Sequence, residues 1–156
     1  MSVGNQEFKV SNLTGARILF VDDDEIILET LKIGMSDIEC EVMLATDATQ
    51  ALEILAQHPA DIVVSDINMP GIPGDEFLEM IARKYPETIR MVLTGYADSH
   101  SVLQAINLGR IWGYMEKPWD KDKLIISLEQ AMFTQKVMAE RSLLKATLES
   151  YEVHIK

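Results

Sequence analysis

Five short apolar runs alternate with segments of helical spacing, and this alternation constrains the fold more than any other feature of the sequence. The runs span residues 16–21, 42–45, 62–65, 89–93 and 111–115. Each run is four to six residues long and is bounded by turn signals. This length and composition are typical of strands that are buried on both faces, as in a parallel sheet.

Between the runs, apolar residues recur every three or four positions, which predicts helices. The predicted helices lie at 26–35, 48–55, 77–82 and 102–108, with stop signals at Pro59, Tyr85-Pro86 and Gly109. A fifth amphipathic segment starts after Asp120. Strands that alternate with helices require right-handed crossovers. The sequence therefore predicts an α/β protein with an open, doubly wound parallel sheet covered on both sides.

The size and composition of the chain indicate one globular domain with an appendage. Its 156 residues can form one core but are too few for two ordinary domains. No window holds about 18 consecutive apolar residues, and the polar start lacks the regions of a secretory signal. We therefore expect a cytoplasmic protein without membrane association. Cys40 is the single cysteine, which excludes an internal disulfide and a multi-cysteine metal site.

The net charge of -11 lies in the first part of the chain. Residues 1–119 hold 8 Lys and Arg against 19 Asp and Glu, whereas residues 120–156 hold 6 of each kind. Surfaces that bind nucleic acid are basic, and this chain would repel phosphate backbones. Direct binding of nucleic acid is not expected.

Polar residues follow four of the five predicted strands. Asp22, Asp23 and Asp24 follow the first strand, Asp66 the third, Thr94 the fourth and Lys117 the fifth. In open parallel sheets, ligands gather beyond the carboxyl ends of the strands, so these side chains are expected to converge. Carboxylates that repel one another are tolerated around a hard divalent cation, which predicts a Mg²⁺ site with Asp23 and Asp66 as ligands.

Each of these signals has an ordinary structural explanation when it is taken alone. The acids after the first strand could simply start a helix, with Asp22 and Glu25 spaced as a variant of the capping box. Asp66 could be a turn residue, Thr94 a strand end, and Lys117 a solvated lysine before a turn. Their joint placement after four strands favours a shared site.

Four segments carry a resemblance to a known family: "ILFVDDDE", "DIVVSDINMPGIPGDEFL", "MVLTGYAD" and "GYMEKPW". In this order and at this spacing, the chain resembles the receiver domain of two-component response regulators over residues 15–132. The resemblance implies a flavodoxin-like sheet with strand order 2-1-3-4-5. The pattern "LTGYAD" followed by "KPWD" is similar to the subgroup often attached to cyclic-nucleotide phosphodiesterase or kinase outputs.

The resemblance also implies a phosphorylation site. Asp66 would accept a phosphoryl group from a sensor histidine kinase or a phosphotransfer protein. Asp22 and Asp23 would hold Mg²⁺ together with Asp66 and the backbone carbonyl of Asn68. The chain would then be a regulatory domain that assists only its own phosphorylation and dephosphorylation, and not an enzyme with an external substrate.

The remaining site residues implied by the resemblance form a switch. Lys117 and Thr94 would contact the phosphoryl group, and Tyr114 would be the switch aromatic, with Trp112 as the other candidate. The Lys117-Pro118 bond is expected to be cis. Phosphorylation would change the surface formed by the fourth helix, the fifth strand and the fifth helix.

The last helix is predicted to be longer than the sheet needs. From 120 to about 151 there is no proline or glycine, and about 32 helical residues would extend about 48 Å. We expect an N-terminal tail at 1–14, a receiver domain at 15–132, and a projecting helix at 133–156 that acts as a coiled coil, as a homodimer contact or as a linker to an absent output domain. Folding back onto the domain, or fraying after about 140, are the alternatives.

Two other functions compete with the phosphorylation switch. A docking module could keep the fold, ignore phosphate and assemble partners through the long helix. A Mg²⁺-dependent hydrolase of the haloacid dehalogenase type also uses an aspartyl phosphate, but it requires a second acid two residues after the nucleophile. Asn68 holds that position, which disfavours the hydrolase.

Overall fold

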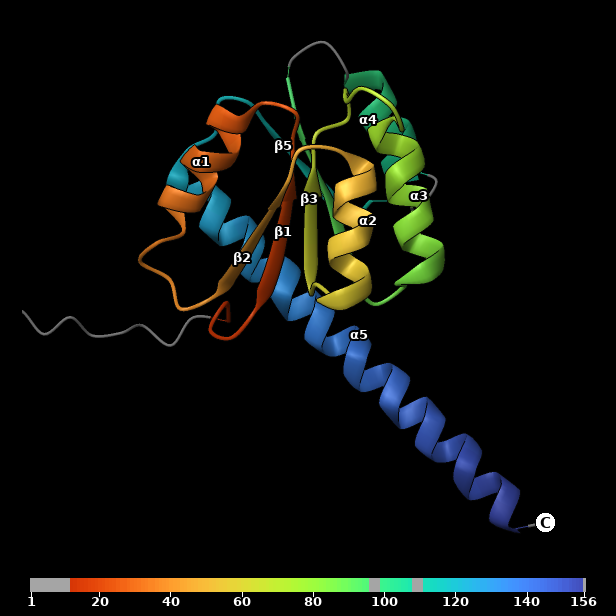
Figure 1. Cartoon of the computed structure of the whole chain (residues 1–156). Coiled ribbons are helices and arrows are strands. Elements are labelled where there is room, and N and C mark those ends of the chain that lie inside the picture. The colour runs from red at the N-terminus through yellow and green to blue at the C-terminus, as the bar shows by residue number, and fades with distance from the viewer. Residues whose placement is uncertain (1–11, 96–98, 108–110, 156) are drawn as a thin grey trace, which may run out of the picture.

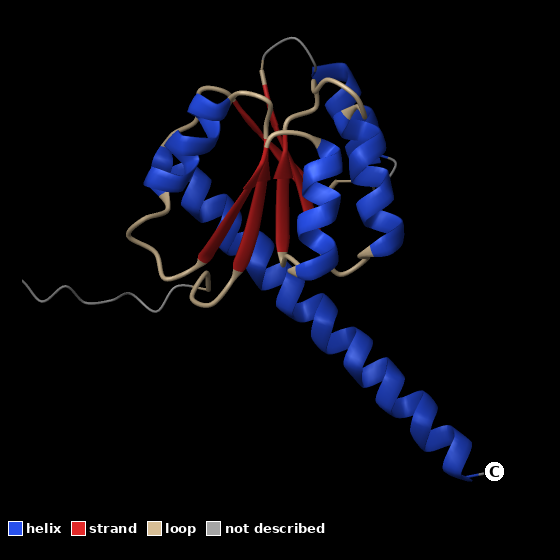
Figure 2. Cartoon of the chain, in the orientation of Figure 1, coloured by secondary structure: helices blue, strands red, loops and turns tan. Residues whose placement is uncertain are grey.

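The fold is a five-stranded parallel sheet between two layers of helices. In the computed structural model, residues 12–95, 99–107 and 111–155 are described. The strands are β1 (Arg17–Val21), β2 (Glu41–Ala45), β3 (Ile62–Ser65), β4 (Ile89–Thr94) and β5 (Gly113–Glu116), and the helices are α1 (Glu25–Gly34), α2 (Ala48–Gln57), α3 (Gly74–Lys84), α4 (Ser99–Asn107) and α5 (Lys121–Ile155). The strand order is β2-β1-β3-β4-β5, with every pair parallel, which confirms the predicted fold class (Figures 1 and 2).

The sheet has one apolar core on each face, because successive residues of a strand point to opposite sides. Alternate strand residues such as Phe20 and Val64 pack with α1 and α5. Their neighbours Leu19 and Val63 pack with α2 and α3 on the other face. This two-sided burial explains why the strands read as continuous apolar runs in the sequence.

The fifth strand begins two residues later than the apolar run predicts. Ile111 is buried and Trp112 donates its backbone N–H to the carbonyl of Arg90, but the β-ladder itself starts at Gly113. An apolar run indicates which residues are buried, and here the buried residues begin before the strand pairing does. The predicted end of the fourth helix at Gly109 lies outside the described residues.

The fold of the chain starts before residue 15. Leu13 is fully buried in the core beside α1 and α5, and Gly15 donates its N–H to the carbonyl of Glu39. Leu13 belongs to the predicted N-terminal tail, whose residues 1–11 lie outside the described part of the chain. The domain boundaries themselves stay a prediction.

Helix α5 is one continuous helix of 35 residues that crosses under the sheet and projects beyond it (Figure 1). Residues 141–152 are all exposed, so the helix neither folds back onto the domain nor ends near residue 140. Within the described residues, no helix has the length and apolarity needed to cross a membrane.

Candidate functional site

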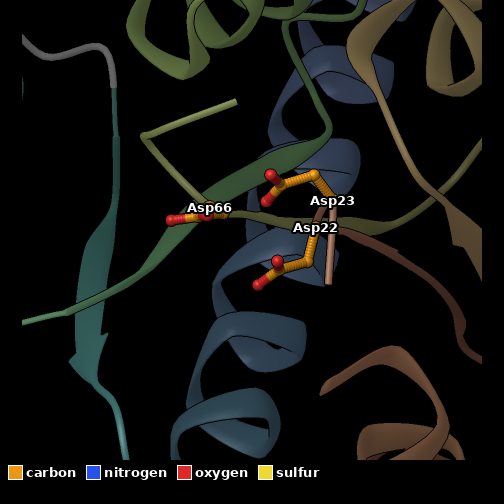
Figure 3. Close-up of side chains that lie close together, drawn as sticks. All are labelled: Asp22, Asp23 and Asp66. Carbon is orange, nitrogen blue, oxygen red and sulfur yellow. The ribbon is translucent and has the colours of Figure 1, made fainter. Parts of the chain in front are cut away.

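Three carboxylates meet at the carboxyl edge of the sheet, where β1 and β3 lie side by side. Asp22 and Asp23 follow β1, and Asp66 follows β3 (Figure 3). One carboxylate oxygen from each of the three lies within 4.8 Å of the others. The chain leaves β1 toward β2 on one side and returns to β3 on the other, which makes this edge the switch point where α/β sheets bind ligands.

Lys117 lies against two of these carboxylates. Its Nζ is 2.7 Å from Asp22 Oδ2 and 3.5 Å from Asp66 Oδ2. The backbone N–H of Lys117 donates to the carbonyl of Thr94 at 2.8 Å, which fixes the lysine at the end of β5. The Lys117-Pro118 bond is cis, as predicted. The structure thus brings an ammonium group and three acids together from three separate strand ends.

The acids after β1 make different hydrogen bonds from those of the capping box that their spacing suggests. Asp24 is the residue that caps α1, because its Oδ1 accepts the N–H of Ile26 at 3.0 Å. Asp22 instead accepts the N–H of Asp24 at 2.9 Å and the charged bond from Lys117. The capping role suggested for Asp22 was wrong, since a lysine 95 residues away outcompetes the local arrangement.

Asp66 is positioned by backbone contacts on both of its sides. Its N–H donates to the carbonyl of Val21 at 2.8 Å, and its carbonyl accepts the hydroxyl of Ser65 at 2.9 Å. The N–H of Asn68 lies 3.4 Å from Asp66 Oδ1. These contacts hold the carboxylate at the edge of the sheet with 8% of the residue exposed.

Gly74 is a site residue that was not predicted from the sequence. It is the first residue of α3, and a Cβ added to it would lie 2.4 Å from the carbonyl oxygen of Asp66 and 2.6 Å from the Cα of Ile67. A glycine is therefore needed for α3 to start against the loop that carries Asp66. The Pro73-Gly74 pair at a helix start, inside the segment after Asp66, was the available signal.

The environment of Asp66 raises the pKa of its carboxyl group. Burial is the largest cause, and the negative charges of Asp22 and Asp23 add to it. Lys117 and the backbone N–H of Asn68 act in the opposite direction. Burial and the neighbouring acids thus favour the neutral form of this carboxyl group. A carboxyl group with a raised pKa at the edge of a sheet is typical of a functional site, in which a bound cation or another charged group offsets the negative charge.

Comparison with known proteins decides the family. A family model described as the response regulator receiver domain matches residues 18–129, which is most of the chain. The chain is a member of the response regulator receiver domain family.

Known response regulators share this receiver domain as a part of their length. The hydrogenase transcriptional regulatory protein HoxA of Cupriavidus necator is 33% identical over 77% of this chain and 25% of its own length. A putative response regulator, NtrX-like, of Rickettsia felis is 34% identical over 83% of this chain and 27% of its own length. This chain therefore spans about a quarter of these curated relatives.

Solved structures give the same answer. The signal receiver domain of an HD domain-containing protein from Pseudomonas fluorescens Pf-5 matches with a TM-score of 0.77 and 39% identity, over 81% of this chain and 93% of that one. NtrX from Brucella abortus, in complex with ADP, matches with a TM-score of 0.79 and 31% identity, over 84% and 30% respectively. The receiver fold is thus shown by sequence and by structure.

Thr94 and Tyr114, two of the residues expected to form the switch, lie on the same face of the sheet. Thr94 is buried at the end of β4, and its hydroxyl donates to the carbonyl of Gly95 at 3.0 Å. Tyr114 pairs with Val92 in the β4–β5 register, two residues before the pair of Thr94 and Glu116. Because strand residues alternate between faces, Thr94 and Tyr114 point to the same side. Tyr114 is 46% exposed.

Asp66→Asn is expected to stabilise the fold near neutral pH, because the folded pKa of Asp66 lies above its ordinary value of 3.8. The protonated form favours folding, so its contribution is complete below the unfolded pKa and is lost as pH rises through the folded pKa. Asparagine keeps the shape of the side chain and cannot ionise, so this loss of stability with rising pH does not occur. Urea denaturation of both proteins without Mg²⁺, from about pH 4 to pH 7, should show the variant's advantage growing with pH. An advantage that shrinks with pH would contradict this assignment.

Proposed function

We propose that this receiver domain is a phosphorylation-dependent switch in which Asp66 accepts a phosphoryl group from a sensor histidine kinase or a phosphotransfer protein. The observation that carries the proposal is the convergence of Asp22, Asp23, Asp66 and Lys117 at one edge of the sheet. Membership of the family supports it, since receiver domains are regulatory parts of two-component systems. Residues 15–132 would form the switch, and 133–156 would connect it to a partner or an output domain.

In the proposed reaction, a carboxylate oxygen of Asp66 attacks phosphorus and the bond from phosphorus to the donor's histidine nitrogen breaks. The leaving nitrogen keeps the electron pair of that bond. Two anions must approach each other, so positive charge at the site decides the rate. Lys117, at 3.5 Å from the Asp66 carboxylate, can neutralise the phosphoryl oxygens.

The acids of the site suit Mg²⁺, which prefers oxygen ligands and retains several waters. Asp22, Asp23, Asp66 and the backbone carbonyl of Asn68 would hold the ion. When bound, Mg²⁺ would offset negative charge on the phosphoryl oxygens. The three carboxylate oxygens within 4.8 Å of one another fit such an ion, because they leave positions for water and phosphate.

The proposed output is a change on the surface of α4, β5 and α5. Added charge on Asp66 would draw the hydroxyl of Thr94 away from the Gly95 carbonyl, its partner at 3.0 Å. Space would open behind Thr94, and the exposed ring of Tyr114 on the same face could enter it. Such an element has two states that are biased by one local charge event. The chain acts on its own carboxylate and not on an external substrate.

Phosphodonor and phosphoryl-mimic experiments test the proposal directly. With Mg²⁺ and a small-molecule phosphodonor, intact-mass spectrometry should show one added phosphoryl group on the wild type and none on Asp66→Asn. Asp75→Asn, an exposed acid of α3, serves as a control and should be modified normally. Beryllofluoride with Mg²⁺ should shift the NMR signals of the Tyr114 ring. If neither reagent acts, the chain is a phosphate-independent docking module.

Mg²⁺ is expected to raise the melting temperature of the wild type, and Asp23→Asn should remove most of this increase. A ligand present at one hundred times its dissociation constant stabilises the folded state by about 2.7 kcal/mol. Asp24→Asn is the matched control, because Asp24 carries the same charge one residue later but serves as the cap of α1, where asparagine functions equally well. Equal losses in both variants would point to a nonspecific charge effect.

A further inference from the structure

Helix α5 has two apolar faces. The inner face packs on the sheet and is buried through Leu124, Leu128 and Ala131. The outer face points away from the sheet and carries Ile126 and Phe133, which are both more than half exposed. A helix that covers one side of a sheet needs the inner face alone, so the outer face calls for a separate explanation.

The outer apolar face continues along the projecting half of α5 without changing direction. Its members, which we call the α5 stripe, are Ile126, Phe133, Val137, Leu144, Leu148 and Tyr151, with exposed fractions between 47% and 66%. At about 100° per residue, all six lie within a sector of roughly 60°. The stripe therefore runs straight from the receiver body to the end of the helix.

The stripe has polar interruptions at two turns, at Glu129 and Gln130 near the receiver body and at Glu140 and Arg141 on the projecting half. Glu140 and Arg141 occupy the turn between Val137 and Leu144, and they lie on opposite flanks, about 50° to either side of the centre. One flank of this turn is thus acidic and the other basic. Charges placed in this way beside an apolar stripe are the elements that set orientation and register in coiled coils.

We propose that the α5 stripe binds a second copy of this chain as a parallel, in-register helical pair over residues 133–151. A two-fold axis parallel to the helices makes each stripe residue face its own counterpart, so one apolar stripe is sufficient for both sides. In this arrangement unlike flanks meet, which places Glu140 beside Arg141 of the partner subunit, twice. In an antiparallel pair like flanks meet, and the Glu140 flanks would lie together.

The stripe joins the receiver body next to the proposed output surface. Ile126 and Phe133 line a surface hollow together with Trp112, which lies just before β5. Tyr114 follows two residues later on β5 itself. A second copy on the stripe would therefore reach the surface that the switch is proposed to change. The signalling role of this dimer rests on the proposed function, whereas the dimer itself does not.

Two neighbouring leucines provide a matched test of the dimer. Leu144 belongs to the stripe, whereas Leu143 is equally exposed, at 67% against 62%, but lies about 100° away around the helix. In sedimentation equilibrium, the wild type should be a dimer, Leu143→Asn should match it, and Leu144→Asn should weaken association at least about tenfold. A wild type that stays monomeric at its highest soluble concentration, or equal losses in both variants, would overturn the proposal.

Two further variants test the orientation. In a Cys40→Ala background, Val137→Cys and Leu148→Cys should each form a disulfide with their own counterpart under oxidation, since both face the partner in a parallel pair. An antiparallel pair can link at most one of the two positions, so a single linked position overturns the parallel arrangement. Glu140→Lys should weaken the dimer, and Glu140→Lys with Arg141→Glu should restore it.

The proposed dimer and the proposed phosphorylation can be refuted independently of each other. Sedimentation is carried out without a phosphodonor, and Asp66→Asn should still dimerise through the stripe. Phosphorylation of Leu144→Asn should proceed as in the wild type, because Leu144 lies in the fully exposed stretch 141–152 of α5, away from the site. A monomer that accepts phosphate refutes the dimer alone, and a dimer that does not accept phosphate refutes the switch alone.

Discussion

Replacing Lys117 with methionine is expected to slow phosphorylation of Asp66 by about 10²-fold or more, the usual loss when one group that stabilises developing charge is removed. Methionine keeps most of the length of the side chain and removes the positive charge. The reason is electrostatic, since the Lys117 Nζ lies 3.5 Å from the carboxylate that must approach an anion. The rate can be followed by intact-mass spectrometry with a small-molecule phosphodonor and saturating Mg²⁺.

The same substitution should change the stability of the chain in a way that identifies its cause. Asp22 is 2% exposed and would lose its ammonium partner at 2.7 Å, which is expected to cost about 3 kcal/mol, the lower end for a broken buried pair because part of Lys117 reaches solvent. Mg²⁺ should recover most of this loss. Bound Mg²⁺ replaces the lost positive charge of Lys117 beside Asp22, but it does not replace the contact of the lysine with the phosphoryl group.

Lys121→Met is the control for the loss of a lysine as such. Lys121 pairs with Asp37 at 3.2 Å on an exposed surface, where such pairs are worth less than about 1 kcal/mol. Its phosphorylation rate should equal that of the wild type. If Lys117→Met is phosphorylated at the normal rate, Lys117 serves only to balance the charge of Asp22, and its proposed role toward phosphate is wrong.

The convergence of the site was predictable because a parallel sheet leaves few arrangements for residues that follow its strands. Once 16–21 and 62–65 are interpreted as buried parallel strands, Asp22 and Asp66 must emerge at the same edge. Which strands are neighbours came from the resemblance to receiver domains and not from the apolar pattern. The prediction that Lys117 joins the same site as Asp22 needed both the resemblance and the apolar pattern, since 95 residues separate the two side chains in the sequence.

The details that the sequence did not predict are those in which a distant contact competes with a local pattern. Asp22 and Glu25 have the spacing of a capping box, but Lys117 holds Asp22, and Asp24 caps α1 instead. The apolar residues of the last helix likewise divide between two faces, because only its first part packs on the sheet. Leu124 and Leu128 face the sheet, whereas Leu144 and Leu148 belong to the opposite side of the same straight helix.

Gly74→Ala is expected to destabilise the fold by about 3 kcal/mol, the upper end for an overpacked position. The added Cβ would lie 2.4 Å from the carbonyl oxygen of Asp66 and 2.9 Å from that of Ile67. Both neighbours are backbone atoms, so no side chain can rotate to relieve the contact. The start of α3 or the loop that carries Asp66 must move, and guanidinium denaturation should report the cost.

Gly34→Ala is the matched control, since Gly34 also lies in a helix and a Cβ added there meets nothing within 4 Å. It should raise stability by up to about 1 kcal/mol, because alanine favours the helix over glycine. Gly74→Ala should also weaken stabilisation by Mg²⁺, since a displaced loop takes one of the three carboxylates out of place. A variant as stable as Gly34→Ala, with an unchanged response to Mg²⁺, would mean that α3 can retreat without disturbing Asp66.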